Sequence, residues 1–234
     1  MQAIILLGGQ GTRLQKLYPD RPKALAPIAG RTFLEWQLAW LARHGIHDVH
    51  LAAGHLAQAI RQWVASTPLK SQVTISVEPH PLGTGGGLKF TEPFIRTDPF
   101  LILNGDSLLP NLDFHTLEDA DQTPDMLITL AITRIESAGR YGTVEFDERK
   151  RVTAFREKAA RTGGWINGGV YLARQALLNH IETDKNLSLE TEVFPTLCTE
   201  GQISVFIAAP PLMDMGTPDG IIAMERYLRN PATN

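Results

Sequence analysis

Short apolar runs alternate with longer amphipathic segments throughout the first half of the chain. The short runs predict buried strands, and the longer segments, in which apolar residues recur every three to four positions, predict helices. The segment 33–45 shows this spacing at Phe33, Leu38 and Leu41, and Gly45 is expected to end the helix. The other elements predicted in this half are strands at 3–7, 48–53, 73–78 and 99–104, a helix at 56–66, and a glycine-rich turn followed by a short segment at 86–94.

Closely spaced strand-like runs replace this alternation after Asp125. The predicted strands are 126–133, 142–147, 151–155 and 165–173. The predicted helices are 173–180, 189–199 and 218–230. Strands that alternate with helices indicate a mostly parallel sheet with helices on both faces. Because no linker, repeat or low-complexity tract divides the chain, we expect one α/β domain over residues 1–234 with a β-rich insertion.

Composition and charge narrow the class of protein. A net charge of −3 and a pI of about 6.2 argue against a nucleic-acid binder that relies on a basic surface. The single cysteine, Cys198, excludes an internal disulfide framework and a cysteine-rich metal site. No apolar run approaches the roughly 20 residues of a membrane span, and the apolar start is too short for a signal peptide. We expect a cytoplasmic protein with no nucleic-acid or membrane partner, and its oligomeric state, a homo-oligomer included, stays open.

The stretch LLGGQGTRL, Leu6 to Leu14, follows the first predicted strand and holds three glycines and an arginine. A dinucleotide fingerprint requires G-x-G-x-x-G and an acidic residue about 20 positions later. Here Leu14 replaces the third glycine, and the expected acidic region offers Arg31 first and Glu35 inside a helix. A Walker A loop, G-x-x-x-x-G-K-[ST], is absent from the chain. These departures disfavour a nicotinamide-dependent oxidoreductase and a P-loop enzyme.

Two cations, Arg13 and Lys23, accompany this glycine loop. Exposed backbone N–H groups and two fixed cations suit a triphosphate, where several adjacent anionic oxygens must be neutralised. The alternative is a tight turn followed by a solvated arginine and a surface lysine, and the glycines alone fit either interpretation. The whole arrangement favours a phosphate site.

Eight motifs, in this order, resemble the sugar-1-phosphate nucleotidylyltransferase family. They are GGQGTRL at 8–14, PKALAPI at 22–28, PLGTGGGLK at 81–89, LNGDS at 103–107, RYGTVEFD at 140–147, FREK at 155–158, INGGVYL at 166–172 and DMGTPD at 214–219. The resemblance runs nearly end to end. It implies a Rossmann-like, three-layer nucleotidyltransferase fold of the GT-A-like type, with a mostly parallel mixed sheet and a β-rich insertion that binds sugar.

The reaction implied by the resemblance joins a sugar 1-phosphate to a nucleoside triphosphate and releases pyrophosphate. The sugar phosphate oxygen attacks the α-phosphorus in line, so positioning and charge neutralisation replace a protein nucleophile. The implied catalytic residues are Arg13, Lys23, Asp106, Lys158 and Asp214. Two adjacent carboxylates repel each other unless a cation joins them, so Asp106 and Asp214 are expected to hold Mg²⁺. The alternative makes Asp106 a turn residue and Asp214 the cap of the final helix.

The resemblance also implies the residues of two substrate sites. The nucleotide site comprises Leu7, Gly8, Gly9, Gly11, Thr12, Arg13, Lys23, Glu78, Gly83, Thr84 and Asn104. The sugar-phosphate site comprises Gly142, Glu157, Lys158, Asn167, Gly168 and Glu190. The alternatives are an exposed ion pair at Glu157–Lys158 and a β-bulge at Asn167–Gly168. Ala159 stands where many family members have proline, which leaves the path of the following loop open.

The nucleobase is predicted from Glu78, which ends the strand 73–78. Relatives that use uridine or thymidine often have glutamine there. A carboxylate only accepts hydrogen bonds, and guanine offers two adjacent donors, N1–H and the 2-amino group. The alternative is a solvated glutamate at a strand end. We therefore expect GTP as the nucleotide substrate.

The sugar is predicted from the segment SLETEVFP, Ser188–Pro195, which resembles one found in mannose-type guanylyltransferases, with Glu190 facing the sugar. The short chain and its motifs look most like the guanylyltransferases for D-glycero-D-manno-heptose 1-phosphate. Mannose 1-phosphate, or another sugar 1-phosphate with a uridylyl or thymidylyl donor, is the alternative. A non-catalytic nucleotide-binding protein is a remote alternative because Arg13, Lys23, Asp106 and Asp214 are all present.

Three of the seven histidines, His44, His47 and His50, are spaced by threes. They straddle a helix end and the start of a strand, so one coordinating face is not expected. We expect them to be surface histidines.

Overall fold

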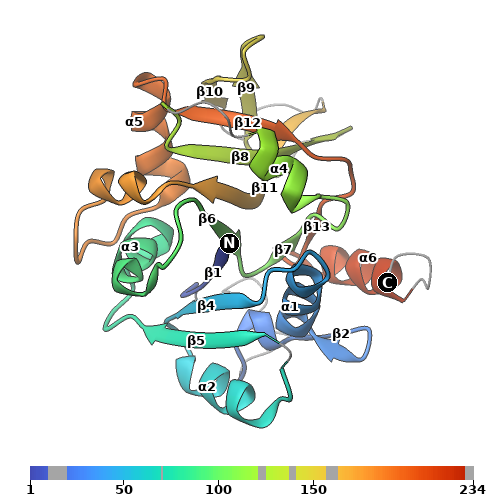
Figure 1. Cartoon of the computed structure of the whole chain (residues 1–234). Coiled ribbons are helices and arrows are strands. Elements are labelled where there is room, and N and C mark those ends of the chain that lie inside the picture. The colour runs from blue at the N-terminus through green and yellow to red at the C-terminus, as the bar shows by residue number, and fades with distance from the viewer. Residues whose placement is uncertain (10–19, 70, 121–124, 137–140, 157–162, 230–234) are drawn as a thin grey trace.

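A nine-stranded sheet runs through the computed structural model (Figure 1), which describes residues 1–9, 20–69, 71–120, 125–136, 141–156 and 163–229. The main strand order is β10-β9-β11-β6-β1-β4-β5, and β8 pairs with β11 and β12. The first-half strands are β1 (Gln2–Leu7), β4 (Asp48–Ala53), β5 (Gln72–Val77) and β6 (Phe100–Asn104). The second-half strands are β8 (Ile128–Ile135), β9 (Thr143–Phe146), β10 (Val152–Arg156), β11 (Gly164–Ala173) and β12 (Ile203–Ile207).

The sheet has two halves that differ in strand direction. In the parallel half, β6, β1, β4 and β5 all run the same way. In the antiparallel half, β11 pairs antiparallel with β6, β8 and β9, and β9 with β10. The prediction of a mixed α/β sheet is confirmed. The β-rich second half continues the same sheet, so the parallel character is confined to the first half and to the β8–β12 pair.

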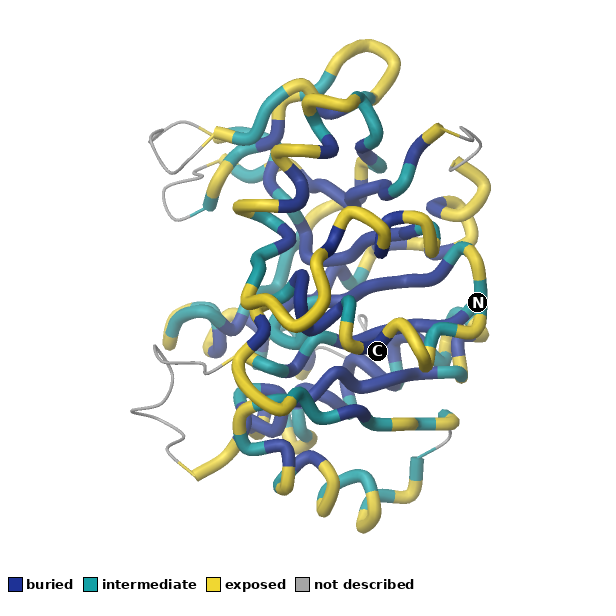
Figure 2. Tube along the Cα trace, turned by 90° about the vertical axis from the view of Figure 1, so that its left-hand side faces the viewer, coloured by how far each residue is buried: buried dark blue, intermediate teal, exposed yellow. Residues whose placement is uncertain are grey.

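Helices cover both faces of the sheet, as the alternation along β1 requires. Ile5 packs with one apolar cluster and Ile4 with another, because successive strand residues point to opposite faces. The first cluster includes residues of α1 (Phe33–Arg43), α2 (Ala57–Ser66), α4 (Phe114–Ala120) and α6 (Pro218–Leu228). The second includes residues of α3 (Gly83–Phe90) and α5 (Phe194–Thr199). Figures 1 and 2 show these three layers, with the buried strands in the middle.

Short elements connect these layers. The short strands are β2 (Pro27–Ile28), β3 (Arg31–Thr32), β7 (Ser107–Leu108) and β13 (Met213–Asp214). The 3₁₀ helices are Lys23–Leu25, Glu92–Phe94 and Gln175–His180, and Leu189–Val193 forms a π-helical turn. None of the helices in the described ranges combines the length and the hydropathy needed to cross a bilayer.

Two predicted elements are corrected. The glycine-rich turn is helix α3, although three consecutive glycines disfavour a helix. The helix predicted at 173–180 begins later, because β11 continues to Ala173 and a 3₁₀ helix follows. The strand β12 was not predicted.

His50 is not a surface residue. Its side chain is fully buried on β4, where Nδ1 hydrogen-bonds with Thr74 Oγ1 at 2.8 Å and Nε2 with Ser76 Oγ at 2.9 Å. Its ring stacks on Phe94 at a centroid distance of 4.6 Å. Burial, assisted by the charge of Arg96, lowers the pKa of His50 to about 4, so the imidazole is neutral at pH 7.

Candidate active site

A cavity of about 430 Å³ lies at the carboxyl ends of β1, β4, β5 and β6. This edge is where open α/β sheets bind ligands. The predicted site residues that line it are Leu7, Gly8, Gly9, Lys23, Glu78, Gly83, Thr84, Asn104 and Asp106. The lining residues that were not predicted are Leu6, Pro22, Ala24, Ala52, Pro81, Gly87, Gly105 and Asn186. Residues from separate motifs therefore meet around one cavity.

Glu78 follows β5, and its carboxylate is held close to two glycines. A Cβ atom on Gly8 would lie 2.7 Å from Glu78 Oε1, and one on Gly54 would overlap the same oxygen. The backbone N–H of Leu82 donates to the carboxylate, and burial raises the pKa of Glu78 from its ordinary value. Glu78 is therefore partly buried at the cavity, with its carboxylate packed against two glycines. Gly54 was not predicted, because its role depends on the neighbouring strand.

Asp106 and Lys23, which also line the cavity, form an ion pair. Lys23 Nζ donates to Asp106 Oδ2 at 2.7 Å, and the side chains are 16% and 42% exposed. Lys23 comes from the 3₁₀ helix Lys23–Leu25 and Asp106 from the turn after β6. This ion pair argues against the alternative of a surface lysine, because the Lys23 cation neutralises a carboxylate at the cavity.

A side chain of α1 holds the turn that carries Asp106 in place through hydrogen bonds. The buried Gln37 side chain donates through Nε2 to the carbonyl oxygens of Asn104 and Ser107, at 2.9 and 3.1 Å. Gly105 donates from its backbone N–H to Leu6 O at 3.1 Å, and a Cβ atom on Gly105 would overlap Leu7. Gln37 was not predicted, since a glutamine within an apolar helix shows no such role in sequence.

Asp214 lies directly beside this turn. β13 pairs antiparallel with β7, with Asp214 opposite Ser107, and the backbone N–H of Met215 donates to Asp106 O at 2.9 Å. Asp214 accepts hydrogen bonds from the Tyr141 hydroxyl at 2.7 Å and from the Gly216 N–H. The two carboxylates expected to share a metal therefore stand on paired backbone segments. Tyr141 was missed as an Asp214 partner.

The donor atoms at this point fit a hard cation. Asp106, in the turn before β7, and Asp214, on the paired strand β13, supply carboxylate oxygens, and the ammonium of Lys23 already compensates one of them. Magnesium binds through one or two carboxylates together with phosphate oxygens and water. No cluster of three or more histidine, cysteine or acidic side chains that could hold a metal occurs among the described residues. Phosphate oxygens of a substrate and water would complete the ligands of an ion held by these two carboxylates.

The glycines of α3 leave room for another segment of the same chain, which crosses the helix. The N–H of Gly85 donates to Leu187 O at 2.8 Å, and the N–H of Leu187 donates to Leu82 O at 2.9 Å. Side chains on Gly83 or Gly86 would overlap carbonyl oxygens of this crossing segment, and Gly83 also has a φ of +71°. The segment leading to Glu190 is thus attached to the helix that lines the cavity.

Glu190 accepts hydrogen bonds from three hydroxyls. Its Oε2 accepts from Thr84 Oγ1 at 2.8 Å and from Ser188 Oγ at 3.0 Å, and its Oε1 accepts from Tyr171 Oη at 3.3 Å. Tyr171 Oη in turn accepts from Asn167 Nδ2 at 2.8 Å. Glu190 and Asn167, both predicted on the sugar side, are therefore linked through Tyr171, which was not predicted.

Asn167 and Gly168 lie at a break in the β11–β8 ladder. The register shifts between Asn167 and Tyr171, and Gly169 has a φ of +73°. The Asn167 Oδ1 atom accepts from the Gly169 N–H at 2.9 Å. A Cβ atom on Gly168 would overlap the Leu109 side chain. The β-bulge is thus present, and packing against Leu109 is one reason for a glycine at position 168.

The remaining predicted residues fall into two groups. Gly142 lies before β9, where a Cβ atom would come within 3.0 Å of Arg156 O. The predicted residues outside the described residues are Gly11, Thr12, Arg13, Glu157 and Lys158.

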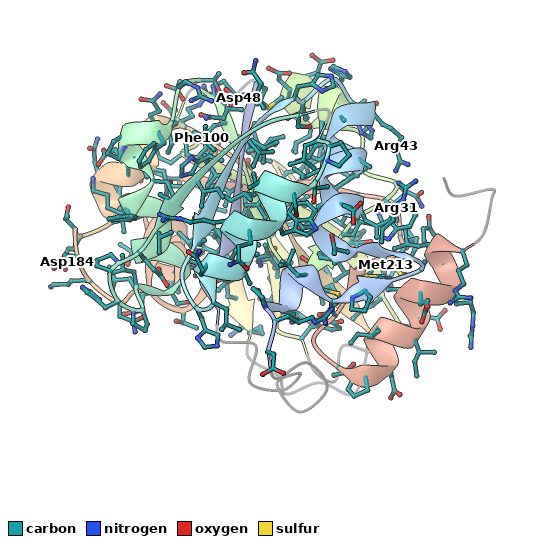
Figure 3. The ribbon with its side chains drawn as sticks, turned by 90° about the horizontal axis from the view of Figure 1, so that it is seen from below. Arg31, Arg43, Asp48, Phe100, Asp184 and Met213 are labelled. Atoms are coloured by element: carbon teal, nitrogen blue, oxygen red, sulfur yellow. The ribbon has the colours of Figure 1, made fainter. Side chains whose placement is uncertain are left out.

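Figure 3 shows Met213, which precedes Asp214, far across the molecule from Asp184. Asp184 Oδ1 pairs with His80 Nε2 at 2.8 Å, near the Glu78 end of the cavity lining.

Comparison with known proteins identifies the family of this site. The nucleotidyl transferase family profile matches residues 2–230. The chain belongs to the nucleotidyl transferase family. The predicted family is confirmed, and the strand-end cavity lies within the matched region. This nucleotidyl transferase is therefore expected to use the carboxyl edge of its parallel half for nucleotide chemistry.

This nucleotidyl transferase is similar to two guanylyltransferases and to one crystal structure. It is 37% identical over 190 residues to the D-glycero-alpha-D-manno-heptose 1-phosphate guanylyltransferase of Campylobacter jejuni, covering 81% of this chain and 83% of the relative. It is 33% identical over 231 residues to the mannose-1-phosphate guanylyltransferase of Mycobacterium tuberculosis, covering 95% of this chain but 63% of the relative. The crystal structure of HddC from Yersinia pseudotuberculosis complexed with GMP-PN is similar at a TM-score of 0.86 and 27% identity, over 97% of this chain and 99% of that one.

Proposed function

We propose that this nucleotidyl transferase is a sugar-1-phosphate guanylyltransferase that acts on D-glycero-D-manno-heptose 1-phosphate. An oxygen of the sugar phosphate attacks the α-phosphorus of GTP, the bond from that phosphorus to the bridging oxygen breaks, and pyrophosphate leaves. The products are the GDP-sugar and pyrophosphate. The names of the Campylobacter relative and the HddC–GMP-PN complex support this assignment.

The observation that carries the guanine assignment is the confined carboxylate of Glu78. It lies at the cavity between Gly8 and Gly54, with the Leu82 N–H as a donor that holds it in place. A carboxylate in this position offers two acceptors to N1–H and the 2-amino group of guanine. Uracil and thymine would instead direct a carbonyl oxygen at the charge, and adenine lacks the paired donors.

The phosphate and metal chemistry is assigned to the other end of the cavity. Nucleotidyl transferases of this family generally use a divalent metal, and we assign Mg²⁺ to Asp106 and Asp214, with phosphate oxygens completing its ligands. When bound, the cation would neutralise charge on the triphosphate. Lys23 then becomes available to the phosphates, together with Arg13 of the glycine loop.

The sugar 1-phosphate is assigned to the antiparallel half of the sheet. Asn167 and Glu190 would hydrogen-bond the sugar hydroxyls, and Glu157 and Lys158, which follow β10, would bind a hydroxyl and the phosphate. Gly142 and Gly168 would let the backbone approach the sugar. The continuous link from Asn167 through Tyr171 to Glu190 supports this division.

Mannose 1-phosphate is the second candidate substrate, because the Mycobacterium tuberculosis relative is named for it. The two sugars share a ring configuration and differ at the exocyclic carbon. This chain spans 63% of that relative's length, so the similarity concerns only part of that protein.

A substrate matrix tests the proposal. GTP, UTP, dTTP, CTP and ATP are each combined with D-glycero-D-manno-heptose, mannose and glucose 1-phosphates, and pyrophosphate release is measured with Mg²⁺ and with EDTA. We expect the highest kcat/KM for GTP with the heptose phosphate and no release with EDTA. Higher kcat/KM with UTP or dTTP would overturn the guanine assignment, and preference for mannose 1-phosphate would favour the second candidate.

A further inference from the structure

Thr84 was assigned to the nucleotide site, yet its hydroxyl is committed elsewhere. Thr84 Oγ1 donates its single proton to Glu190 Oε2 at 2.8 Å and accepts the N–H of Leu189 at 2.8 Å. A hydroxyl carries one donor proton. It therefore has no proton left for a phosphate oxygen of the nucleotide.

Tyr171 approaches the same carboxylate from the centre of the sheet. Its side chain is fully buried, and its hydroxyl donates to Glu190 Oε1 at 3.3 Å while accepting from Asn167 Nδ2 at 2.8 Å and, more weakly, from Asn104 Nδ2 at 3.5 Å. Burial and the charge of Glu190 raise the pKa of Tyr171 above its ordinary value, so the hydroxyl keeps its proton.

The Glu190 carboxylate is thereby oriented by groups from three elements. A carboxylate has about four acceptor positions, and the hydroxyls of Thr84, Ser188 and Tyr171 use three of them. Two of these donors lie 106 and 19 residues away in sequence, on α3 and β11. One acceptor position on Glu190 remains for a ligand hydroxyl among the described contacts.

We propose that Thr84 and Tyr171 are positioning residues for the sugar 1-phosphate, which act by orienting Glu190, and that the Thr84 hydroxyl does not bind the nucleotide. The inference rests on the proposed function, in which Glu190 contacts the sugar. It assigns part of helix α3, which lines the nucleotide cavity, to sugar recognition. Substitutions that remove either hydroxyl therefore affect the second substrate more than the first.

Steady-state kinetics with each substrate varied in turn test this inference. Thr84→Val and Tyr171→Phe each remove only a hydroxyl that donates to a charged group, and we expect each to raise the KM for the sugar 1-phosphate by about 10-fold. The KM for GTP stays within about twofold of wild type. Thr84→Ser, which keeps the hydroxyl, restores the wild-type sugar KM.

A matched control comes from the other end of the same helix. Thr91 is buried and its hydroxyl donates to Leu88 O at 2.6 Å, away from the cavity lining. Thr91→Val removes a buried hydroxyl from the end of α3, so it reports any general loosening of the helix. We expect it to leave both KM values within about twofold.

A double-mutant cycle tests that the effect passes through Glu190. On a Glu190→Gln background, Thr84→Val should raise the KM for the sugar 1-phosphate little further, because groups in one hydrogen-bond network are not additive. Full additivity would overturn the inference, and so would a GTP KM that rises as much as the sugar KM in Thr84→Val.

A binding measurement separates this inference from the proposed function. The thermal shift produced by GTP with Mg²⁺ alone is compared between wild type and Thr84→Val, and we expect equal shifts. A wild-type enzyme that releases no pyrophosphate from GTP with any sugar 1-phosphate refutes the proposed function. A reduced GTP shift in Thr84→Val refutes the inference even when wild-type turnover is normal.

Discussion

The proposed nucleotide side and the proposed sugar side of the site are built by different means. The nucleotide side lies at the parallel strand ends, where Gly8, Gly54 and Gly105 each occupy positions at which a Cβ atom would come closer than 3.0 Å to a neighbouring atom. The sugar side lies along β11, where side chains from distant positions form a hydrogen-bonded chain that ends at Glu190.

This difference indicates at which positions a substitution can change the specificity for each substrate. On the nucleotide side, a methyl group added at Gly54 or Gly105 would come within 3.0 Å of a backbone atom, so it should be costly. On the sugar side, three hydroxyls share one carboxylate, so the loss of one hydroxyl should have a moderate effect that is coupled to the others. The predictions below test this contrast, beginning with the proposed metal site.

The largest effect is expected at the paired backbone of β7 and β13. Asp106→Asn and Asp214→Asn each remove one carboxylate from the proposed metal site and should lower kcat by about 10²–10³-fold. Binding of Mn²⁺, followed by electron paramagnetic resonance, should weaken in both variants. Asp219→Asn, an exposed residue on α6, is the matched control. Near wild-type turnover and Mn²⁺ binding in either variant would remove that residue from the metal site.

The burial of His50 on β4 should make the free energy of unfolding depend on pH below neutrality. The pKa of His50 is about 4 in the folded protein and about 6.5 in the unfolded chain, so unfolding takes up a proton between these values. The free energy of unfolding should therefore fall as the pH drops from 6.5 to 4, by up to about 3 kcal/mol from this residue.

Chemical denaturation between pH 7 and pH 4.5 measures this dependence. His50→Gln should flatten the pH profile, whereas His115→Gln, at an exposed position on α4, should leave it unchanged. A profile as steep in His50→Gln as in wild type would show that the buried histidine does not contribute.

A methyl group at Gly54 tests the close contact directly. The new Cβ would overlap Glu78 Oε1 and lie 2.9 Å from Gly8 Cα, so Gly54→Ala should lower stability by about 1–3 kcal/mol and raise the KM for GTP. Gly87→Ala is the graded comparison, because its Cβ would lie at an ordinary 3.5 Å from Glu78 Oε2. Equal KM values for GTP in the two variants would contradict the role of the close contact at Gly54.

A smaller effect is expected from Tyr141→Phe. This change removes the hydroxyl that donates to Asp214 Oδ2 at 2.7 Å. Without that bond Asp214 is less well oriented, and we expect about a fivefold higher Mg²⁺ requirement with little change in maximal rate. The dependence of pyrophosphate release on Mg²⁺ concentration measures it, and an unshifted curve would rule out this role.

The parallel half could be predicted well from sequence because its signals are local. Apolar runs gave the positions of β1, β4, β5 and β6, and these strands bring Glu78 and Asn104 to one edge. Their order along the chain and their parallel direction follow from the intervening helices.

Features that depend on distant partners could not be predicted. Helix α3 forms despite its glycines because the segment ending at Leu187 packs across it. His50 is buried because hydroxyls on β5 satisfy both ring nitrogens. Tyr171 resembles an ordinary apolar strand residue until Glu190 is placed beside its hydroxyl.

The recognition of guanine by Glu78 is the central claim, and the nucleotide preference of Glu78→Gln tests it most directly. The measured quantity is the ratio of kcat/KM for GTP to that for UTP at saturating sugar 1-phosphate. A site that pairs buried groups with the correct base discriminates by on the order of 10²-fold or more, because the wrong base leaves a charge unpaired. We predict that Glu78→Gln lowers this ratio by at least about tenfold while the KM for the sugar 1-phosphate is unchanged. A ratio that is the same in Glu78→Gln and wild type would contradict the account.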